Sequence, residues 1–280
     1  MVRSIVLSMT LMLFSASVLA QGGLLPLSEK EIEIMKTEGK RLWQKRDVKE
    51  SLEEALSKFE LAFDANKKDA ELAQYLIRGY YILGDGHEEN KDLKIKAFEK
   101  AVAIGDAVLE QNEEYAKTLK KKDIESAVEK LTVDQVPVMF WTAASLGKFA
   151  RANGIFSSMK HKSKIQSLVK QVEKLKPDYF HGSVPRYWGG YYAVAPGIAG
   201  GDMKKSKKYF EQSLAMAPEY LGTKVLMADV YYTKKGDKKE FKKILLEVIG
   251  DKSNHPELGP DNAIERKKAE KLLEQEDKLF

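Results

Sequence analysis

The residues best suited to chemistry in this sequence are aromatic side chains that gather in one short segment. Six aromatic residues lie between Tyr179 and Tyr192, interleaved with glycine and proline, which interrupt an ordinary helix. Rings of this kind can stack against a ligand or line a groove, and Arg186 within the segment could hold a carboxylate. A structural ion pair between Arg186 and Asp202 is an equally good interpretation. The chemistry that this segment offers is therefore binding.

Two interpretations of these rings remain open: they fill the core between helices, or they line a groove or cavity for a ligand or partner. Burying one ring contributes roughly 4–6 kcal/mol, whereas association costs at least about 4 kcal/mol. One ring therefore cannot hold a ligand, but three or four converging rings could. Rings on other predicted helices could join them if the helices stack into a curve. The candidate binding residues are Arg186, Tyr187, Trp188, Tyr191, Tyr192, Phe140, Trp141, Tyr80 and Tyr81.

Catalytic and metal-binding patterns have little support. The four histidines are scattered, and none lies in a metal-ligand spacing. Adjacent acids such as Glu53 and Glu54 point to different sides of a helix, so they do not form an acid–base pair. The sequence has no nucleophile elbow, no phosphate-binding glycine loop and no cysteine. We expect a protein that is not an enzyme and that has no catalytic residues, no metal site and no cofactor.

The elements that must position these residues are predicted to be helices. Five segments carry apolar or small residues at the i, i+3, i+4 and i+7 positions of one helix face. Sustained strand-type alternation is not found, and further helices are expected at 31–45, 70–83, 138–152 and 223–234. The five striped segments are Leu52–Phe63, Phe98–Leu109, Ile165–Val172, Ser206–Ala217 and Phe241–Ile249.

The spacing of these stripes is similar to that of tetratricopeptide repeats. Phe59 and Phe98 are 39 residues apart, and Phe210 and Leu245 are 35 residues apart, while the repeat period is about 34 residues. We therefore predict an all-α fold of stacked antiparallel helix hairpins. About four degenerate tetratricopeptide-like repeats would form a curved superhelix or a closed bundle. An ordinary α-bundle with short loops is the alternative.

Two segments interrupt this rhythm. Residues 110–135 are highly charged and are expected to form an extra helix or helical loop on the surface. Residues 178–202 contain the aromatic segment, in which a short helix is expected from Tyr187 to Ala195 and is ended by Pro196. The turns between paired helices are expected at 84–86, 153–154, 200–202 and 236–237, where glycine lies beside Asp or Asn.

Residues 1–20 have the composition of a secretion signal. Arg3 precedes a short apolar run, and small residues lie just before Gln21. The run is shorter than the about 20 residues that a membrane span needs. Because the sequence has no cysteine that could carry a lipid, we expect a freely diffusing periplasmic protein rather than a lipoprotein. The expected organisation is a cleaved signal peptide at 1–20 and a single helical repeat domain at 21–280, with no transmembrane segment in the mature chain.

The charge of the chain argues against nucleic acid as a partner. Lysine and arginine number 47 and acidic residues 42, so the net charge of the 280 residues is only +5. Lysine runs lie beside acids and fit solvated helix faces. An exported protein with so weak a net charge lacks the electrostatic footprint of a nucleic-acid-binding protein.

The second half of the chain resembles the TatT family, the T-components of tripartite ATP-independent periplasmic (TRAP) transporters. The resemblance is densest over roughly the last hundred residues and is weaker before Pro137. The motifs that carry it are Tyr191-Tyr192-Ala193, Pro196-Gly197, Gly200-Gly201-Asp202, Ser206, Phe210, Ala215-Met216-Ala217-Pro218-Glu219, Leu221 to Tyr232, Gly236-Asp237, Phe241, Asn262-Ala263, Lys267-Lys268-Ala269, Leu272-Leu273, Asp277 and Phe280.

This resemblance implies cryptic tetratricopeptide-like hairpins, an apolar pore or cavity in the protomer and trimerisation. It also implies that the chain associates with the solute-binding protein of a TRAP-type transporter and accepts or hands over a small hydrophobic or carboxylate ligand. The absence of a lipid-bearing cysteine departs from the lipoprotein form of the family and puts membrane tethering in doubt. The alternatives are a structural periplasmic adaptor or an envelope scaffold, neither with a small-molecule ligand.

Overall fold

The structure is a computed structural model that describes residues 27–253 and 255–280. The predicted signal peptide at 1–20 lies outside the described residues. Every regular element in the described part is helical, as predicted, and none of these helices is both long and apolar enough to cross a membrane. The elements are α1 (Glu29–Trp43), α2 (Lys49–Ala65), α3 (Ala70–Ile82), η1 (Leu83–His87), α4 (Lys91–Leu109), α5 (Glu113–Leu119), α6 (Ile124–Val128), η2 (Val133–Gln135), α7 (Val136–Ala152), α8 (Ile155–Leu175), α9 (Ser183–Val194), η3 (Gly197–Ala199), α10 (Met203–Met216), α11 (Gly222–Leu226), η4 (Met227–Tyr232), α12 (Thr233–Lys235), α13 (Lys238–Gly250), α14 (Gly259–Glu274) and α15 (Glu276–Leu279).

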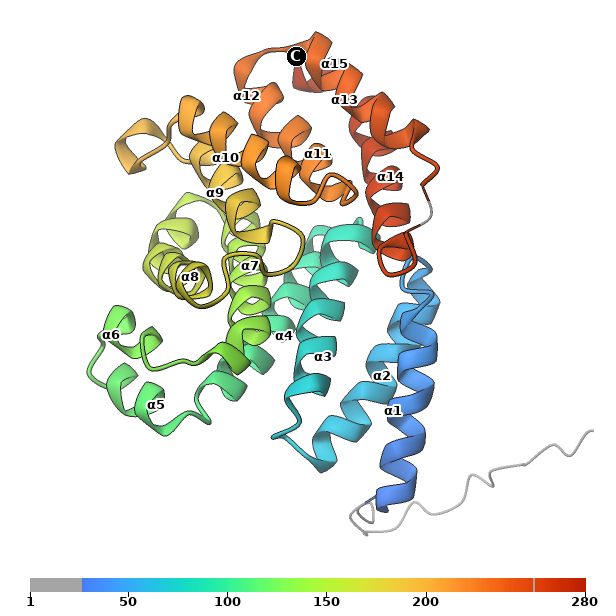
Figure 1. The fold of residues 1–280 in the computed structure, drawn as a ribbon, viewed down its shortest axis with the longest axis vertical. Coiled ribbons are helices and arrows are strands. Elements are labelled where there is room, and N and C mark those ends of the chain that lie inside the picture. The colour runs from blue at the N-terminus through green and yellow to red at the C-terminus, as the bar shows by residue number, and fades with distance from the viewer. Residues whose placement is uncertain (1–26, 254) are drawn as a thin grey trace, which may run out of the picture.

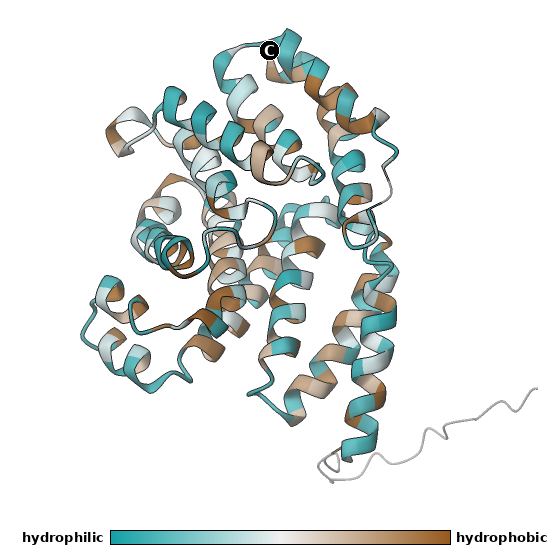
Figure 2. Cartoon of the chain, in the orientation of Figure 1, coloured by the Kyte–Doolittle hydropathy of each residue, from teal (hydrophilic) through white to brown (hydrophobic). Residues whose placement is uncertain are grey.

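Consecutive helices pack against each other in pairs. The pairs α1–α2, α7–α8 and α9–α10 are each joined by a short connection and lie side by side (Figure 1). The predicted apolar stripes face inward in these pairs: Phe59 on α2, Leu168 on α8 and Phe210 on α10 are all fully buried. Figure 2 shows the resulting division of each helix into an apolar side and a polar side. The core therefore forms where the stripes of neighbouring helices meet.

The contact between α9 and α10 depends on a glycine. A β-carbon at Gly189 would lie 2.9 Å from the ring of Phe210, closer than real contacts allow. Ser206 on the same face of α10 donates a hydrogen bond of 2.8 Å to the Gly189 carbonyl. Small residues at these positions let the two helices approach closely.

Three of the four predicted turns are confirmed, and the remaining one is different. Gly154, Gly200 and Gly236 have positive φ angles, between 71° and 95°, where glycine is favoured. The predicted turn at 84–86 instead continues α3 as the π-helical segment η1. Gly84 lies close to the ring of Phe98, where a β-carbon would come within 2.7 Å of the ring, so the absence of a side chain allows this packing.

Residues 110–135 are less exposed than their charge predicted. They form α5, α6 and η2, and α6 packs against α8. Tyr115, Val128 and Leu131 are buried in the main core, while the charged residues between them remain outside. The segment is thus a helical layer with an apolar face, not only a surface loop.

Helix α14 ties the C-terminal helices back to the beginning of the chain. Asn262, near its start, accepts a hydrogen bond from the Leu221 backbone N–H at 3.0 Å and donates one to the Glu219 carbonyl at 2.9 Å. Farther along, Lys271 pairs with Glu89 at 2.7 Å. In Figure 1 α14 lies beside the turn that follows α1. Helix α14 therefore packs against the turn that follows α1 and the segment that follows η1.

Candidate functional site

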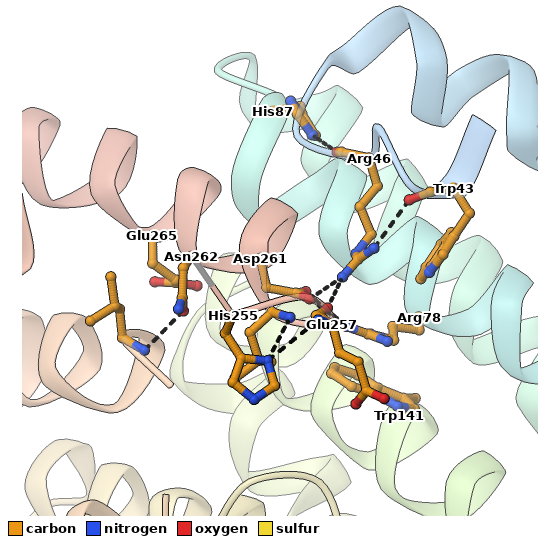
Figure 3. Close-up of polar contacts among 12 residues, drawn as sticks. Trp43, Arg46, Arg78, His87, Trp141, His255, Glu257, Asp261, Asn262 and Glu265 are labelled. Carbon is orange, nitrogen blue, oxygen red and sulfur yellow. Dashed lines mark hydrogen bonds and ion pairs between the residues drawn. The ribbon is translucent and has the colours of Figure 1, made fainter. Parts of the chain in front are cut away.

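The centre of the molecule holds a carboxylate between two arginines. Asp261 of α14 pairs with Arg46, which follows α1, and with Arg78 of α3, whose Nη2 lies 2.8 Å from Oδ1 and 2.9 Å from Oδ2 (Figure 3). Arg46 also donates to the Trp43 carbonyl at 3.1 Å and the Glu257 carbonyl at 2.9 Å. Burial alone would raise the pKa of Asp261, but the two arginines outweigh it and lower that pKa.

Aromatic rings enclose the second of these arginines. The Arg78 guanidinium lies over the rings of Trp43, Trp141 and Phe180, at 4.6–5.4 Å from their centroids. Phe180 in turn contacts Tyr220, with ring centroids 5.7 Å apart. Cation–π contacts strengthen as the cation is removed from water, and only 13% of the Arg78 side chain is exposed. We call Arg46, Arg78, Trp141, Phe180, Tyr220 and Asp261 the central cluster.

A second charged group lies next to the central cluster. Asp85 of η1 accepts from Lys148 of α7 at 2.5 Å and from Lys268 of α14 at 2.7 Å. Burial would raise the pKa of Asp85, but the two lysines outweigh it and hold that pKa well below its ordinary value. Lys268 also pairs with Glu265 at 3.0 Å, yet burial keeps the pKa of Glu265 above its ordinary value.

Asp85, Lys148 and Lys268 line a cleft of about 480 Å³ between η1, α4 and α7 on one side and α11, η4 and α14 on the other. Cavities of this size hold small molecules in many proteins. Two of the bordering segments, η1 and η4, are π-helical, a form that often occurs at functional sites. The lining residues are Asp85, Gly86, Glu88, Glu89, Lys94, Lys148, Val225, Leu226, Asp229, Lys268, Lys271, Leu272, Glu274 and Gln275.

A much smaller hollow of about 20 Å³ shares Asp85 and Gly86 with the cleft and reaches the central cluster. Tyr81, Trp141 and Tyr220 supply its aromatic side, and Asp261 and Glu265 supply its polar side. Burial raises the pKa of both tyrosines, so they carry neutral hydroxyls. Glu265 is buried, and its Oε2 has no hydrogen-bond partner among the described residues. A small molecule in the hollow could therefore form a hydrogen bond with a polar atom that has no partner in the described chain.

The structure brings three of the predicted binding residues to this region. Tyr81 and Trp141 have ring centroids 5.2 Å apart and line the small hollow. Phe140 packs edge-on against Trp141 at 5.2 Å and is buried in the core. The Trp141 indole N–H donates to the Tyr179 hydroxyl at 3.1 Å. Burial raises the pKa of Tyr179 to about 12.

Four other predicted residues form a separate group, which we call the α9 cluster: Tyr187, Trp188, Tyr191 and Tyr192. Their rings contact one another at 5.0–6.4 Å between centroids. Tyr192 also stacks on Tyr209 of α10 at 5.6 Å. The Tyr191 hydroxyl donates to the Ala199 carbonyl at 2.6 Å, and the Trp188 indole N–H donates to Glu173 at 3.2 Å. Neither hollow described above is lined by this cluster.

Of the remaining two predicted residues, Arg186 packs against Tyr220 of the central cluster, and Tyr80 lies elsewhere. Arg186 donates from Nη1 to the His181 carbonyl at 2.7 Å and to the Thr223 hydroxyl at 3.4 Å, and its guanidinium lies 4.4 Å from the Tyr220 centroid. The alternative ion pair with Asp202 is not formed, because Asp202 instead caps α10. Tyr80 points to the other side of α3 and donates to Glu60 at 2.7 Å.

The charged residues of the site were not predicted from the sequence. Arg46, Arg78 and Asp261 are ordinary residues in their own helices and turns, separated by up to 215 positions. Their contact could not be predicted from the spacing of residues within one helix. The one local signal was Gly84-Asp85-Gly86, which marked an unusual backbone at the position of Asp85 but suggested only a turn.

Comparison with known proteins agrees with the resemblance seen in the sequence. No curated protein matches the chain. A family described as TRAP transporter T-component (TAtT) matches residues 85–280, which include the end of η1 from Asp85, the α9 cluster and α14. Because this match covers well over half of the sequence, the chain belongs to the TRAP transporter T-component family.

Proposed function

We propose that this protein is a periplasmic accessory component that binds the solute-binding protein of a TRAP-type transporter and accepts a small hydrophobic or carboxylate ligand. The observation that carries the ligand part is the 480 Å³ cleft beside the central cluster, in a chain of this transporter family. The cleft is lined by lysines and acids and also by the apolar residues Val225, Leu226 and Leu272. Such a mixture suits a molecule with one charged and one apolar end.

The repeat register predicted from the sequence is part of this proposal. Ser206 and Phe210 are both fully buried on α10, and Pro218 follows the helix. The close packing of α9 on α10 through Gly189 is the geometry that paired repeat helices require. Repeat proteins of this kind bind partners along their stacked surface, so we place the solute-binding protein there. A homotrimer remains a prediction of the same resemblance.

The proposed location is the periplasm. It rests on the composition of residues 1–20 and on the family, whose transporter partner is extracytoplasmic. Mass spectrometry of the N-terminus after expression in a Gram-negative host should find a chain that begins at Gln21. A chain that keeps residues 1–20 in the cytoplasm would contradict the location.

The partner proposal is tested by native mass spectrometry of the chain with the solute-binding protein of the same transport system. We expect a complex of defined stoichiometry that also retains a ligand when the proteins come from cells. If neither a complex nor a retained ligand is found, the transporter role is wrong. A structural adaptor would then be the better explanation, and the tightly packed α9 cluster is the observation that favours it.

The cleft can be tested separately with a pair of tryptophan variants. Gln275→Trp places a large ring at the mouth of the cleft on an exposed position. Lys278→Trp adds the same ring on α15, which does not line the cleft. We expect the first variant to lose the retained ligand and the second to keep it. Equal ligand content in both would place the ligand somewhere else.

A further inference from the structure

The three most exposed large apolar side chains of the described chain lie at one place in the fold. Ile198 is 100% exposed, Phe156 is 85% exposed and Met159 is 66% exposed. Ile155 and Val194 are also exposed. Phe156 and Met159 lie in the first turns of α8, and Ile198 lies in η3, after α9. We call these five residues the α8–η3 patch.

Two contacts join the parts of this patch. Lys162 of α8 donates to the Ala199 carbonyl at 3.0 Å, directly beside Ile198. The ammonium group of Lys162 also lies 5.7 Å from the ring centroid of Tyr191, near the end of α9. Met159 precedes Lys162 by one helical turn and therefore lies on the same side of α8. Met159 and the η3 turn thus belong to one surface, and Phe156, one helical turn before Met159, continues it along α8.

The shape of this surface is convex. The turn that carries η3 projects from the edge of the molecule, and its tip is apolar (Figures 1 and 2). Glycines 197, 200 and 201 surround Ile198 in the sequence, so no large neighbouring side chain covers it. A projecting apolar tip fits poorly into a flat protein interface. Such a tip is suited to enter the boundary between the headgroups and the acyl chains of a lipid bilayer.

The charge around the patch is positive. From Ile155 to Val172 the chain has four lysines and no acidic residue; Lys164 pairs with Asp106 of α4 at 2.5 Å, which leaves Lys160, Lys162 and Lys170 as the excess positive charge. Lys204 and Lys205 follow the η3 turn and are exposed, with Asp202 the nearest acid in the sequence. Lysines beside an apolar surface attract anionic lipid headgroups, each by an amount that falls away within a Debye length.

We propose that the α8–η3 patch binds the surface of a membrane that contains anionic lipid, with Phe156, Met159 and Ile198 entering the headgroup region. The chain has no cysteine for a covalent lipid, and this contact would bring it reversibly to the membrane. The proposal is independent of the transporter role, because it concerns a surface outside the cleft and the central cluster.

The test is co-sedimentation of the purified protein with phosphatidylcholine vesicles, with and without about 30 mol % phosphatidylglycerol. We expect binding to the anionic vesicles, weakening as salt is raised. Phe156→Ser combined with Ile198→Ser should lower the partition coefficient by about tenfold or more, since two large apolar groups are lost. The matched control is Val133→Ser with Leu246→Ser, which removes two side chains that are 57% and 51% exposed at other sites.

A local readout distinguishes insertion from simple charge attraction. The three tryptophans of the chain, Trp43, Trp141 and Trp188, are buried, so they give a constant background. The fluorescence emission of the introduced tryptophan in the Ile198→Trp variant should shift to the blue on anionic vesicles and should be quenched by brominated lipid.

Three results would each overturn the proposal: failure of the protein to bind vesicles, an equal loss of binding in the control pair, or an Ile198→Trp emission that does not change. Loss of the solute-binding protein, or of self-association, in the Phe156→Ser and Ile198→Ser variant without vesicle binding would assign the patch to a protein interface instead.

Discussion

The α9 cluster and the central cluster contrast in how the chain assembles them. The four rings of the α9 cluster lie within six residues, and two of them, Trp188 and Tyr191, donate hydrogen bonds to near neighbours on α8 and on the η3 turn. The central cluster takes Arg46, Arg78 and Asp261 from segments far apart in the sequence and places them beside a hollow. The α9 cluster, whose rings are close in the sequence, is closely packed. The central cluster, whose residues are far apart in the sequence, places polar atoms beside a hollow.

This difference distinguishes aromatic residues that stabilise the packing of helices from residues that form a binding site. An aromatic ring on a helix is most simply stabilised by the rings one turn away, and α9 supplies them. A buried carboxylate between two guanidiniums has no such local source of stability and requires distant elements to hold it. If the comparison is right, the two clusters should respond differently to substitution.

The largest effect is expected at the centre. Asp261→Ala leaves Arg46 and Arg78 buried without their carboxylate, and breaking a buried pair costs about 3–5 kcal/mol. The loss should approach the upper figure because two cations lose one partner. Urea denaturation measures the free energy of unfolding. Asp277→Ala, at a carboxylate that is 97% exposed and pairs with Lys238 on the surface, is the matched control and should cost far less, because a surface ion pair contributes little to stability. A small loss for Asp261→Ala would mean that Asp261 does not hold the centre together.

A slightly smaller loss is expected where α9 meets α10. Phe210→Ala removes a fully buried ring that lies against Gly189, and we expect a loss of about 3–5 kcal/mol in the free energy of unfolding. Thermal and chemical denaturation both report it. Tyr209→Ala on the adjacent, partly exposed position serves as the control and should cost less. Near-neutral behaviour of Phe210→Ala would show that the predicted repeat register is wrong.

These two positions also show what the sequence could predict. The stripe containing Phe210 repeats at helical spacing, so its helix and its buried face followed from the residues alone. Asp261 lies in a segment without a strong stripe, and its partners are set by how α14 returns to α1 and α3. The sequence likewise placed Trp141 on a helix but could not show that it faces Arg78. Local periodicity determines elements, while sites of this kind depend on packing between distant ones.

The third effect depends on pH and concerns Glu265. Burial raises its pKa above the ordinary 4.5, so the folded chain favours the neutral acid. Its contribution to stability is therefore present below that ordinary pKa and is lost as pH rises through the folded value. Glu265→Gln cannot ionise, so its stability relative to the wild type should increase with pH over this window. Urea denaturation at a series of pH values tests this. Glu274→Gln, on an exposed part of the same helix, should show no such trend. A relative stability that falls as pH rises would contradict the assignment.

The smallest effect on stability is expected in the α9 cluster, at Trp188. Trp188→Phe keeps an aromatic ring in the α9 cluster but removes the indole N–H that donates to Glu173. One hydrogen bond to an exposed partner contributes about 0.5–1 kcal/mol, so the melting temperature should change little. Trp188→Ala also removes the ring and should lower stability further. If either variant weakens binding of the solute-binding protein by more than its stability loss explains, the α9 cluster is a recognition surface as well as a packed core. If binding falls only in step with stability, its rings serve packing alone, and the function of the chain lies with the centre.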